Sequence, residues 1–198
     1  MVHTPPKLIC LIGAECTGKT TLARSLAHEY SGRWVPERLR LFCDAMGRTP
    51  LQHEQIGILE QQARDEMEAL EEAVRHQQDY VFCDTAPLLT AVYSEFVFDD
   101  TSLYPRARAL HARYSMTLIL EPDLPWIADG LQRDGAHVQR PIHTKIMQQL
   151  HGLGGLLYPV AGSGESRAIS ARAAIQAGIH LGSELQQRHP LPLGNSRV

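Results

Sequence analysis

The feature that most constrains the fold is the run of residues 13–20, Gly-Ala-Glu-Cys-Thr-Gly-Lys-Thr, which matches the pattern G-x-x-x-x-G-K-[ST]. The apolar run 8–12 precedes it, and Leu22 and Leu26 follow it at helical spacing. A phosphate-binding loop needs this context, because the loop and the N-terminus of the next helix present backbone N–H groups to the phosphates. The sequence therefore predicts a nucleoside triphosphate site between a strand and a helix. The alternative is an ordinary glycine-rich turn.

The residue types in this loop indicate how a nucleotide would be held. Glycines allow the backbone to wrap a phosphate, Lys19 supplies a positive charge for the outer phosphates, and the Thr20 hydroxyl is a ligand for Mg²⁺. We therefore expect ATP and Mg²⁺ as cofactors, with Lys19 also in a catalytic role. The expected nucleotide-binding residues are Gly13, Ala14, Glu15, Cys16, Thr17, Gly18, Lys19, Thr20 and Thr21.

Length and composition are those of one globular domain. The chain has 198 residues, and we expect a single domain over residues 1–185 followed by a flexible tail over 186–198. Its 19 basic and 22 acidic residues give a net charge of −3, which offers no basic field for nucleic acid. The N-terminus has no apolar signal segment, and no stretch approaches 18 apolar residues. We expect a cytoplasmic protein that binds neither nucleic acid nor membranes.

Hydrophobic patterning predicts an α/β fold. Strand-like runs alternate with segments of helical character, which is typical of a parallel β-sheet flanked by helices. These runs cover residues 8–12, 33–36, 80–83, 116–120 and 156–160. Helical character returns over 168–185, and Pro125 and Pro141 suit the first turns of helices on either side of a segment that contains Gly and Arg. That segment is a candidate helical lid.

The longest predicted helix lies within residues 51–78, between the second and third strand-like runs. Apolar residues recur in it at steps of three and four, which indicates one buried face. This face consists of Ile56, Leu59, Ala63, Met67, Leu70 and Val74. We expect the Glu and Gln residues of the helix to form a solvated face.

Asp84 ends the third strand-like run, which is where a phosphate-loop protein carries the carboxylate on the magnesium side. We expect Asp84 to hold Mg²⁺, or to accept the proton of a substrate hydroxyl that attacks the γ-phosphate. Both roles stay open at this point. The alternative is a helix N-cap, because Asp84 and Thr85 precede Pro87 and an apolar helical segment.

Glu37 and Arg40 follow the second strand-like run, at the same edge of the predicted sheet. A carboxylate there would bind ribose hydroxyls, and an arginine would bind phosphate or pair with the carboxylate. Both are candidates for an acceptor pocket, and a surface ion pair is the alternative. Tyr93, on the helix after Asp84, is expected to stack on a base or ring, with a place in the core as the alternative.

Arginines in and beside the candidate lid are expected to act on the transferred phosphoryl group. Phosphoryl transfer places negative charge on the equatorial oxygens, and a cationic side chain on a closing segment stabilises that charge. Arg133 is the first candidate and Arg140 the second. The alternative for either residue is an exposed helical arginine.

Taken together, four segments resemble the kinase domain of the bifunctional NadR-type proteins. They are residues 13–20, Pro36-Glu37 with Arg40, Asp84-Thr85, and the run Pro-Trp-Ile-Ala-Asp-Gly-Leu at 125–131 with Arg133. The resemblance covers about residues 7 to 170. It implies a P-loop NTPase fold akin to nucleoside and nucleoside monophosphate kinases, and phosphorylation of nicotinamide riboside with ATP. It also implies kinase roles for Lys19, Thr20, Asp84 and the two arginines, and substrate or lid contacts for Glu37 and Trp126.

One departure from the family concerns the acceptor side. The family pattern after the third strand resembles Asp-Thr-Asp, whereas this chain has Asp84-Thr85-Ala86 and lacks the second acid. The chain also contains no H-x-G-H nucleotidyltransferase motif, so adenylyl transfer is not implied. We expect a small-molecule kinase that acts on nicotinamide riboside or a related nucleoside. The alternative is an ATP-binding switch or a partner-binding ATPase without a small-molecule acceptor.

Overall fold

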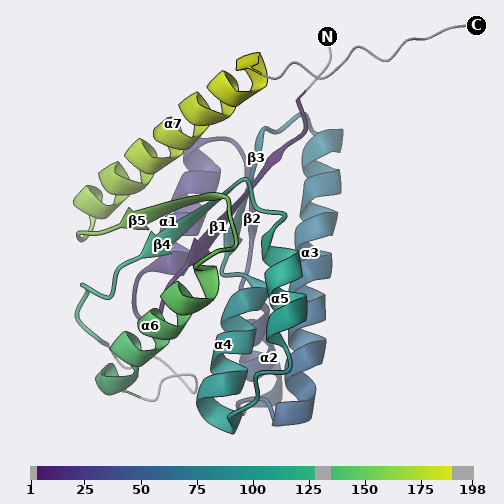
Figure 1. The fold of residues 1–198 in the computed structure, drawn as a ribbon, viewed down its shortest axis with the longest axis vertical. Helices are drawn as coiled ribbons and strands as arrows, with labels where there is room; N and C mark the ends of the chain where they lie inside the picture. Colours follow the sequence, from purple (N-terminus) through teal and green to yellow (C-terminus); the bar gives the residue numbers. More distant parts are fainter. Residues whose placement is uncertain (1–3, 128–134, 189–198) are drawn as a thin grey trace, which may run out of the picture.

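The computed structural model describes residues 4–127 and 135–188, and these contain a five-stranded parallel sheet with helices on both faces (Figure 1). The strands are β1 Lys7–Ile12, β2 Arg33–Val35, β3 Tyr80–Asp84, β4 Met116–Leu120 and β5 Leu156–Val160. Their order in the sheet is β2-β3-β1-β4-β5, so the strand before the phosphate loop is central. Every predicted strand is present, with ends that differ by at most one residue. The predicted fold class is confirmed.

The central strands are continuous apolar runs because helices cover both faces of the sheet. In β1, the side chains of Leu8, Cys10 and Ile12 belong to one buried cluster, and those of Ile9 and Leu11 belong to the cluster on the other face. The edge strands β2 and β5 keep partly exposed positions. The sheet therefore holds β1 at its centre, between β3 and β4, with the phosphate loop at the carboxyl end of β1.

The helices form two layers on the sheet. One layer consists of α1 Lys19–Glu29 and α7 Glu165–Arg188. The other consists of α3 Gln55–Arg75, α4 Pro87–Phe98, α5 Tyr104–His111 and α6 Gln139–Leu150. The helix α2 Arg38–Met46 packs on α3, and η1 Gln52–Glu54 and η3 Ala136–Val138 are short 3₁₀ turns. In Figure 1, α7 lies along the β5 side of the sheet and α3 along the β2 side. None of the helices in these ranges has both the length and the apolar composition needed to cross a bilayer.

The buried face of α3 differs from the predicted apolar face. Three of the predicted members are exposed by 42–60%, namely Ile56, Met67 and Val74. Gln62 and Glu66 are buried instead. The Gln62 Oε1 atom accepts the Arg38 backbone N–H at 2.8 Å, and Glu66 accepts hydrogen bonds from the Tyr114 hydroxyl and the Arg113 guanidinium, both at 2.7 Å. The prediction of a solvated face is wrong for these two residues, because partners on other elements replace water.

The candidate lid is only partly covered by the structure. Pro141 lies in the first turn of α6, as predicted. No helix begins at Pro125, because residues 125–127 are irregular and the Ile127 carbonyl accepts a hydrogen bond from the Cys16 thiol of the phosphate loop. Residues 128–134, which include Arg133, lie outside the described residues, as do residues 189–198 of the predicted tail. Residues 186–188 belong to α7.

Candidate nucleotide and acceptor site

Residues 13–18 connect β1 to α1 at the carboxyl edge of the sheet, and both motif glycines have a backbone reason to be glycine. Gly18 has a φ of +78°, a region that residues with a Cβ adopt rarely. A Cβ on Gly13 would lie 2.8 Å from the Leu120 carbonyl oxygen and 2.8 Å from the Thr17 Oγ1 atom. The predicted strand, loop and helix are therefore present, and the loop is packed closely against the end of β4.

Lys19, the first residue of α1, crosses the loop. Its Nζ atom donates hydrogen bonds to the carbonyl oxygens of Gly13 at 3.0 Å and Ala14 at 2.8 Å. The Thr17 hydroxyl also donates to the Ala14 carbonyl, at 2.9 Å. Since Lys19 is only 9% exposed, its charge is held at the loop and not in bulk solvent. This is the position from which an ammonium group can contact the outer phosphates.

Asp84 lies beside the loop because β3 pairs with β1. Its Cα is in register with that of Leu11, the penultimate residue of β1. The side chain is 1% exposed, and its carboxylate accepts a hydrogen bond from the Thr20 hydroxyl. The Oδ1 atom has no partner among the described residues. The structure thus brings together the two residues predicted to lie on the magnesium side.

The charge of Asp84 is set by burial and by three nearby cations. Burial raises the pKa of the Asp84 carboxyl above its ordinary value. The Thr20 hydrogen bond and the positive charges of Lys19, Arg40 and Arg24 act in the opposite direction and lower the pKa. A desolvated carboxylate with one oxygen unpaired gains stability from a cation, and Mg²⁺ prefers oxygen ligands. Thr20 and Asp84 therefore fit a magnesium ion.

The N-cap alternative for Asp84 is wrong. The N-cap residue of α4 is Ala86, which has no side-chain cap, and Asp84 is the last residue of β3. Between them, Thr85 has a φ of +82°, an outlier for a β-branched residue, and its N–H donates to the Leu11 carbonyl at 3.0 Å. This strained turn was not predicted, because nothing in the sequence marks a threonine for the left-handed region.

A cavity of about 960 Å³ adjoins the phosphate loop and continues between α2, the start of α3 and α4. On the loop side it is lined by residues 15–21. The other walls include Glu37, Leu39, Arg40, Cys43, Gln55, Leu89, Tyr93, Val97 and Phe98, with Leu124, Pro125 and Ile127 at one border. Thr20 and Lys19 line the cavity wall, whereas Asp84 does not and lies behind them. It therefore acts on the cavity through Thr20, and this favours the magnesium role over direct contact with an acceptor.

The predicted acceptor residues Glu37, Arg40 and Tyr93 all line this cavity. Glu37 is the N-cap residue of α2 and is only 7% exposed, so a surface ion pair does not describe it. Tyr93 also packs against the core, and its hydroxyl donates to the Glu15 carboxylate at 3.2 Å. The place in the core is confirmed, because Tyr93 packs against the buried cluster and also forms part of the cavity wall. Stacking of Tyr93 on a base or ring stays a prediction.

Gln55 is a wall residue that the sequence analysis missed. It is the first residue of α3 and is 4% exposed, and its Oε1 atom is buried with no partner among residues 4–127 and 135–188. A buried amide oxygen without a hydrogen bond is costly, so this atom suits a donor group on a bound molecule. The only signal in the sequence was a glutamine near the start of a predicted helix, which is too common to single out.

Two of the predicted lid residues, Trp126 and Arg140, do not line the cavity, whereas residues 15–21 do. The cavity is bordered by Leu124, Pro125 and Ile127 but not by Trp126. Arg140 is exposed on the first turn of α6 and does not line the cavity. Catalytic roles for Arg140, and for Arg133 outside the described residues, stay predictions.

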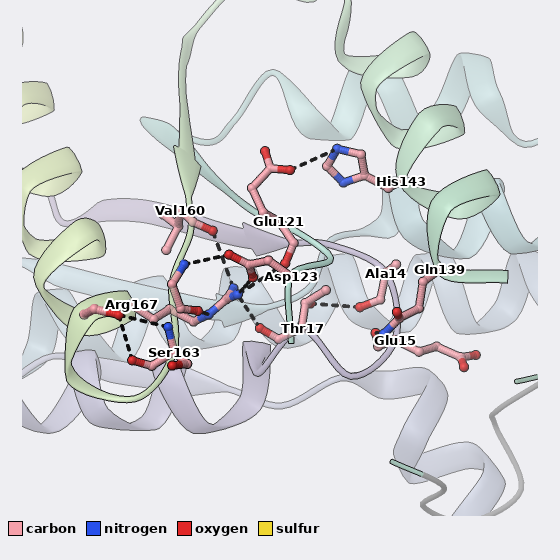
Figure 2. Close-up of polar contacts among 12 residues, drawn as sticks. Ala14, Glu15, Thr17, Glu121, Asp123, Gln139, His143, Val160, Ser163 and Arg167 are labelled. Atoms are coloured by element: carbon pink, nitrogen blue, oxygen red, sulfur yellow. Dashed lines mark hydrogen bonds and ion pairs between the residues drawn. The ribbon is translucent and has the colours of Figure 1, made fainter. Parts of the chain in front are cut away.

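Two residues that the sequence analysis missed hold the phosphate loop from outside the cavity (Figure 2). The Gln139 Nε2 atom, on α6, donates to the Glu15 carbonyl at 2.8 Å. The Arg167 Nη1 atom, on α7, donates to the Thr17 carbonyl at 3.0 Å. Both residues are more than 120 positions from the loop in sequence, so only the fold brings them to it.

Comparisons with known proteins identify the family. A family model described as an AAA domain matches residues 8–167. The chain belongs to this AAA family. Two curated relatives are trifunctional NAD biosynthesis/regulator NadR proteins, from Salmonella typhimurium with 23% identity and from Escherichia coli with 25% identity, each over 147 residues. The matches cover 73% of this chain but only 35% of either relative. The predicted resemblance to NadR is confirmed.

Solved structures show the same fold. A NadR protein in complex with NR has a TM-score of 0.74 at 24% identity, and the match covers 87% of this chain and 51% of that one. NadR in complex with NAD and AMP-PNP has a TM-score of 0.71 at 22% identity, with 87% and 49% covered. The thymidylate kinase of Ehrlichia chaffeensis has a TM-score of 0.63 at 12% identity, with 88% and 99% covered. The chain therefore has the fold of the P-loop nucleoside and nucleotide kinases.

Proposed function

We propose that this protein is an ATP-dependent kinase that transfers the γ-phosphate to a nucleoside hydroxyl, with nicotinamide riboside as the leading acceptor. The observation that carries the proposal is the single cavity of about 960 Å³ that joins the phosphate loop to Glu37, Arg40, Gln55 and Tyr93. This volume is at the upper end of ordinary small-molecule sites, which leaves room for two ligands side by side. A nucleotide switch needs the phosphate loop but not the part of the cavity beside Glu37, Arg40, Gln55 and Tyr93.

On the donor side, the loop N–H groups and Lys19 would bind the phosphates of ATP. Thr20 would hold Mg²⁺ through its hydroxyl oxygen, and Asp84 would support the ion from behind Thr20 with a buried carboxylate, one oxygen of which has no partner among the described residues. When bound, the ion supplies positive charge that neutralises the phosphate oxygens. Asp84 keeps the Thr20 hydroxyl in a single orientation, and Arg40 and Lys19 place positive charge near it.

On the acceptor side, the wall combines hydrogen-bonding groups with apolar surface. Glu37 would accept hydrogen bonds from ribose hydroxyls and so supply the acid that is absent at Ala86, which is fully buried. The Gln55 Oε1 atom would accept a hydrogen bond from a donor on the acceptor, such as a carboxamide N–H. Leu89, Val97 and Phe98, together with Tyr93, provide apolar surface for a flat ring. The NadR complex with NR supports testing nicotinamide riboside first.

The proposal is tested with purified protein, Mg-ATP and a panel of nucleosides that includes nicotinamide riboside, adenosine, deoxyadenosine and uridine. ADP release is followed by a coupled assay, and the phosphorylated product is identified by mass spectrometry. Lys19→Ala should abolish the activity. Lys7→Ala, at the opposite end of β1 from the loop, is the matched control and should leave it unchanged.

We expect ADP release to rise when a nucleoside is added, in step with formation of its monophosphate. If ADP release is the same with and without every acceptor and still requires Lys19, the switch or ATPase alternative is favoured. If nicotinamide riboside is inactive and another nucleoside is phosphorylated, the reaction class stands and the acceptor assignment is wrong.

A further inference from the structure

One buried guanidinium connects the phosphate loop to the ends of β4 and β5. Arg167 is the third residue of α7 and is only 4% exposed. It does not line the cavity that Gly18 lines, so it lies behind the loop and not on its ligand side. Figure 2 shows its side chain extending between the loop and the two strand ends.

Each of the five N–H groups of this guanidinium has an acceptor. The acceptors are the carbonyl oxygens of Gly162 (2.8 Å), Thr17 (3.0 Å), Glu121 (3.3 Å) and Val160 (3.4 Å), and the carboxylate of Asp123. The Asp123 carboxylate also accepts the Gly162 N–H at 2.7 Å. Because arginine presents its donors in a rigid planar fork, a complete set of acceptors leaves the group one position. The flexible ammonium of lysine cannot reproduce it.

The contact with Thr17 determines the direction of an N–H inside the loop. In a trans peptide unit, the carbonyl oxygen of one residue and the N–H of the next point in opposite directions. Since the Thr17 carbonyl points toward Arg167, the Gly18 N–H points away from Arg167, toward the cavity. Gly18 has no Cβ to resist rotation of this peptide unit, and the hydrogen bond from Arg167 to the Thr17 carbonyl supplies a restraint on it.

Gln139 provides the same restraint two residues earlier. Its amide donates to the Glu15 carbonyl at 2.8 Å, and by the same geometry the Cys16 N–H points away from Gln139. Side chains from α6 and α7 thus hold two carbonyls of the loop from outside. Dipoles that are oriented before a ligand binds cost no reorganisation when the ligand arrives.

We infer that Arg167 is a positioning residue for triphosphate binding, because it keeps the Gly18 N–H turned toward the phosphates. The inference rests on the proposed nucleotide site but not on the identity of the acceptor. Without the guanidinium, the peptide unit between Thr17 and Gly18 is free to turn its carbonyl oxygen toward the phosphates, where it repels them. The resulting loss of affinity concerns the phosphate part of the ligand and not the nucleoside part.

The test compares Arg167→Met and Arg167→Lys with Arg172→Met, a control on the same helix whose guanidinium makes exposed ion pairs with Glu29 and Glu165. Dissociation constants for Mg-ATP and for inorganic tripolyphosphate are measured by calorimetry below the melting temperature of each variant. We expect Arg167→Met to weaken both ligands by the same factor, about 10- to 100-fold, as for loss of a hydrogen bond to a charged group. Arg167→Lys should be intermediate and Arg172→Met unchanged.

A direct readout comes from the backbone amide resonance of Gly18 in ¹⁵N-labelled protein. Tripolyphosphate should shift this resonance in the wild type and in Arg172→Met, and much less in Arg167→Lys, which retains a positive charge and is the variant expected to fold most readily. The inference would be overturned if the Arg167 variants had a lower melting temperature but unchanged affinities for both ligands and an unchanged Gly18 shift. Arg167 would then be merely structural. Weaker ATP binding with tripolyphosphate binding unaffected would also overturn the inference. If no acceptor stimulates ADP release in the wild type but Arg167→Met weakens tripolyphosphate binding as expected, the proposed kinase function fails while this inference stands.

Discussion

Replacing Asp84 with asparagine should separate activity from stability. Asparagine has nearly the same size and keeps an oxygen that accepts the Thr20 hydroxyl, so the substitution removes the negative charge and replaces the second carboxylate oxygen with an NH₂ group. The Asp84 side chain is 1% exposed and lies behind the cavity wall, so the substitution does not alter the surface that a bound molecule would contact. The effects on folding and on magnesium can therefore be predicted separately.

The effect on folding follows from the direction of the pKa shift. Burial raises the pKa of Asp84 in the folded chain above its unfolded value, so the group contributes stability below the unfolded pKa and loses it as pH rises through the folded pKa. In its ionised form the buried carboxylate opposes folding, and the neutral amide removes that penalty. Asp84→Asn should therefore keep or raise the melting temperature, by about 2–4 °C for each kcal/mol recovered in a chain of this length.

The effect on activity follows from the position of Asp84 behind Thr20. Loss of a group that orients a metal ligand usually costs about 10- to 100-fold in metal affinity or activity. The assay is the dependence of kcat on Mg²⁺ concentration with the best nucleoside acceptor. Asp84→Asn should require about 10- to 100-fold more Mg²⁺ for half-maximal rate, and high Mg²⁺ should restore part of kcat. Asp79→Asn, exposed at the opposite end of β3, is the matched control and should behave as the wild type.

Two results would refute this reasoning. A kcat that falls about 10²- to 10⁴-fold at every Mg²⁺ concentration would identify Asp84 as the proton acceptor instead. A melting temperature several degrees below that of the wild type would show that the charged carboxylate stabilises the fold, contrary to the direction of its pKa shift.

Three further substitutions test the loop, the acceptor wall and the buried polar network. Gly13→Ala places a Cβ 2.8 Å from the Leu120 carbonyl oxygen, so the affinity for ATP, measured by calorimetry, should fall at least about tenfold. An affinity within about twofold of the wild-type value would contradict the close packing. Gln55→Leu should raise the acceptor KM about tenfold while the ATP KM is unchanged, and an unchanged acceptor KM would remove Gln55 from the site. Burial raises the pKa of Glu66 to about 7, so about 3 kcal/mol of stability is present below pH 4.5 and lost as pH rises through 7. Glu66→Gln should flatten this dependence in urea unfolding at pH 5 and pH 8, and equal losses in both proteins would show that Glu66 is not its source.

The parts of the fold that could be predicted are those that local sequence encodes. Burial on both faces makes β1 from Leu8 onward a continuous apolar run and leaves β4 apolar apart from Thr117. Lys19 and Thr20 follow β1 at positions dictated by the loop geometry. These signals require no knowledge of distant residues. The strand-end place of Asp84 was also predictable, because the carboxyl ends of parallel strands meet at one edge.

The parts that could not be predicted depend on partners far away in the chain. Glu66 and Gln62 are buried in α3 because Tyr114, Arg113 and Arg38 reach them, and a helical pattern of apolar residues contains no record of those partners. The same is true of Gln55, whose importance comes from the cavity beside it. A polar residue inside a periodic pattern is therefore assigned to solvent until the packing is known.

The strand, the phosphate loop and the helix at residues 8–27 can be recognised from the amino-acid sequence, because the glycines, Lys19 and the apolar runs act through local backbone geometry. The place of Asp84 behind Thr20 and the contact of Arg167 with the Thr17 carbonyl, 150 positions away, became known from the packing of the elements. Burial and hydrogen-bond partners depend on how distant elements pack, whereas the conformation of a loop with two required glycines does not.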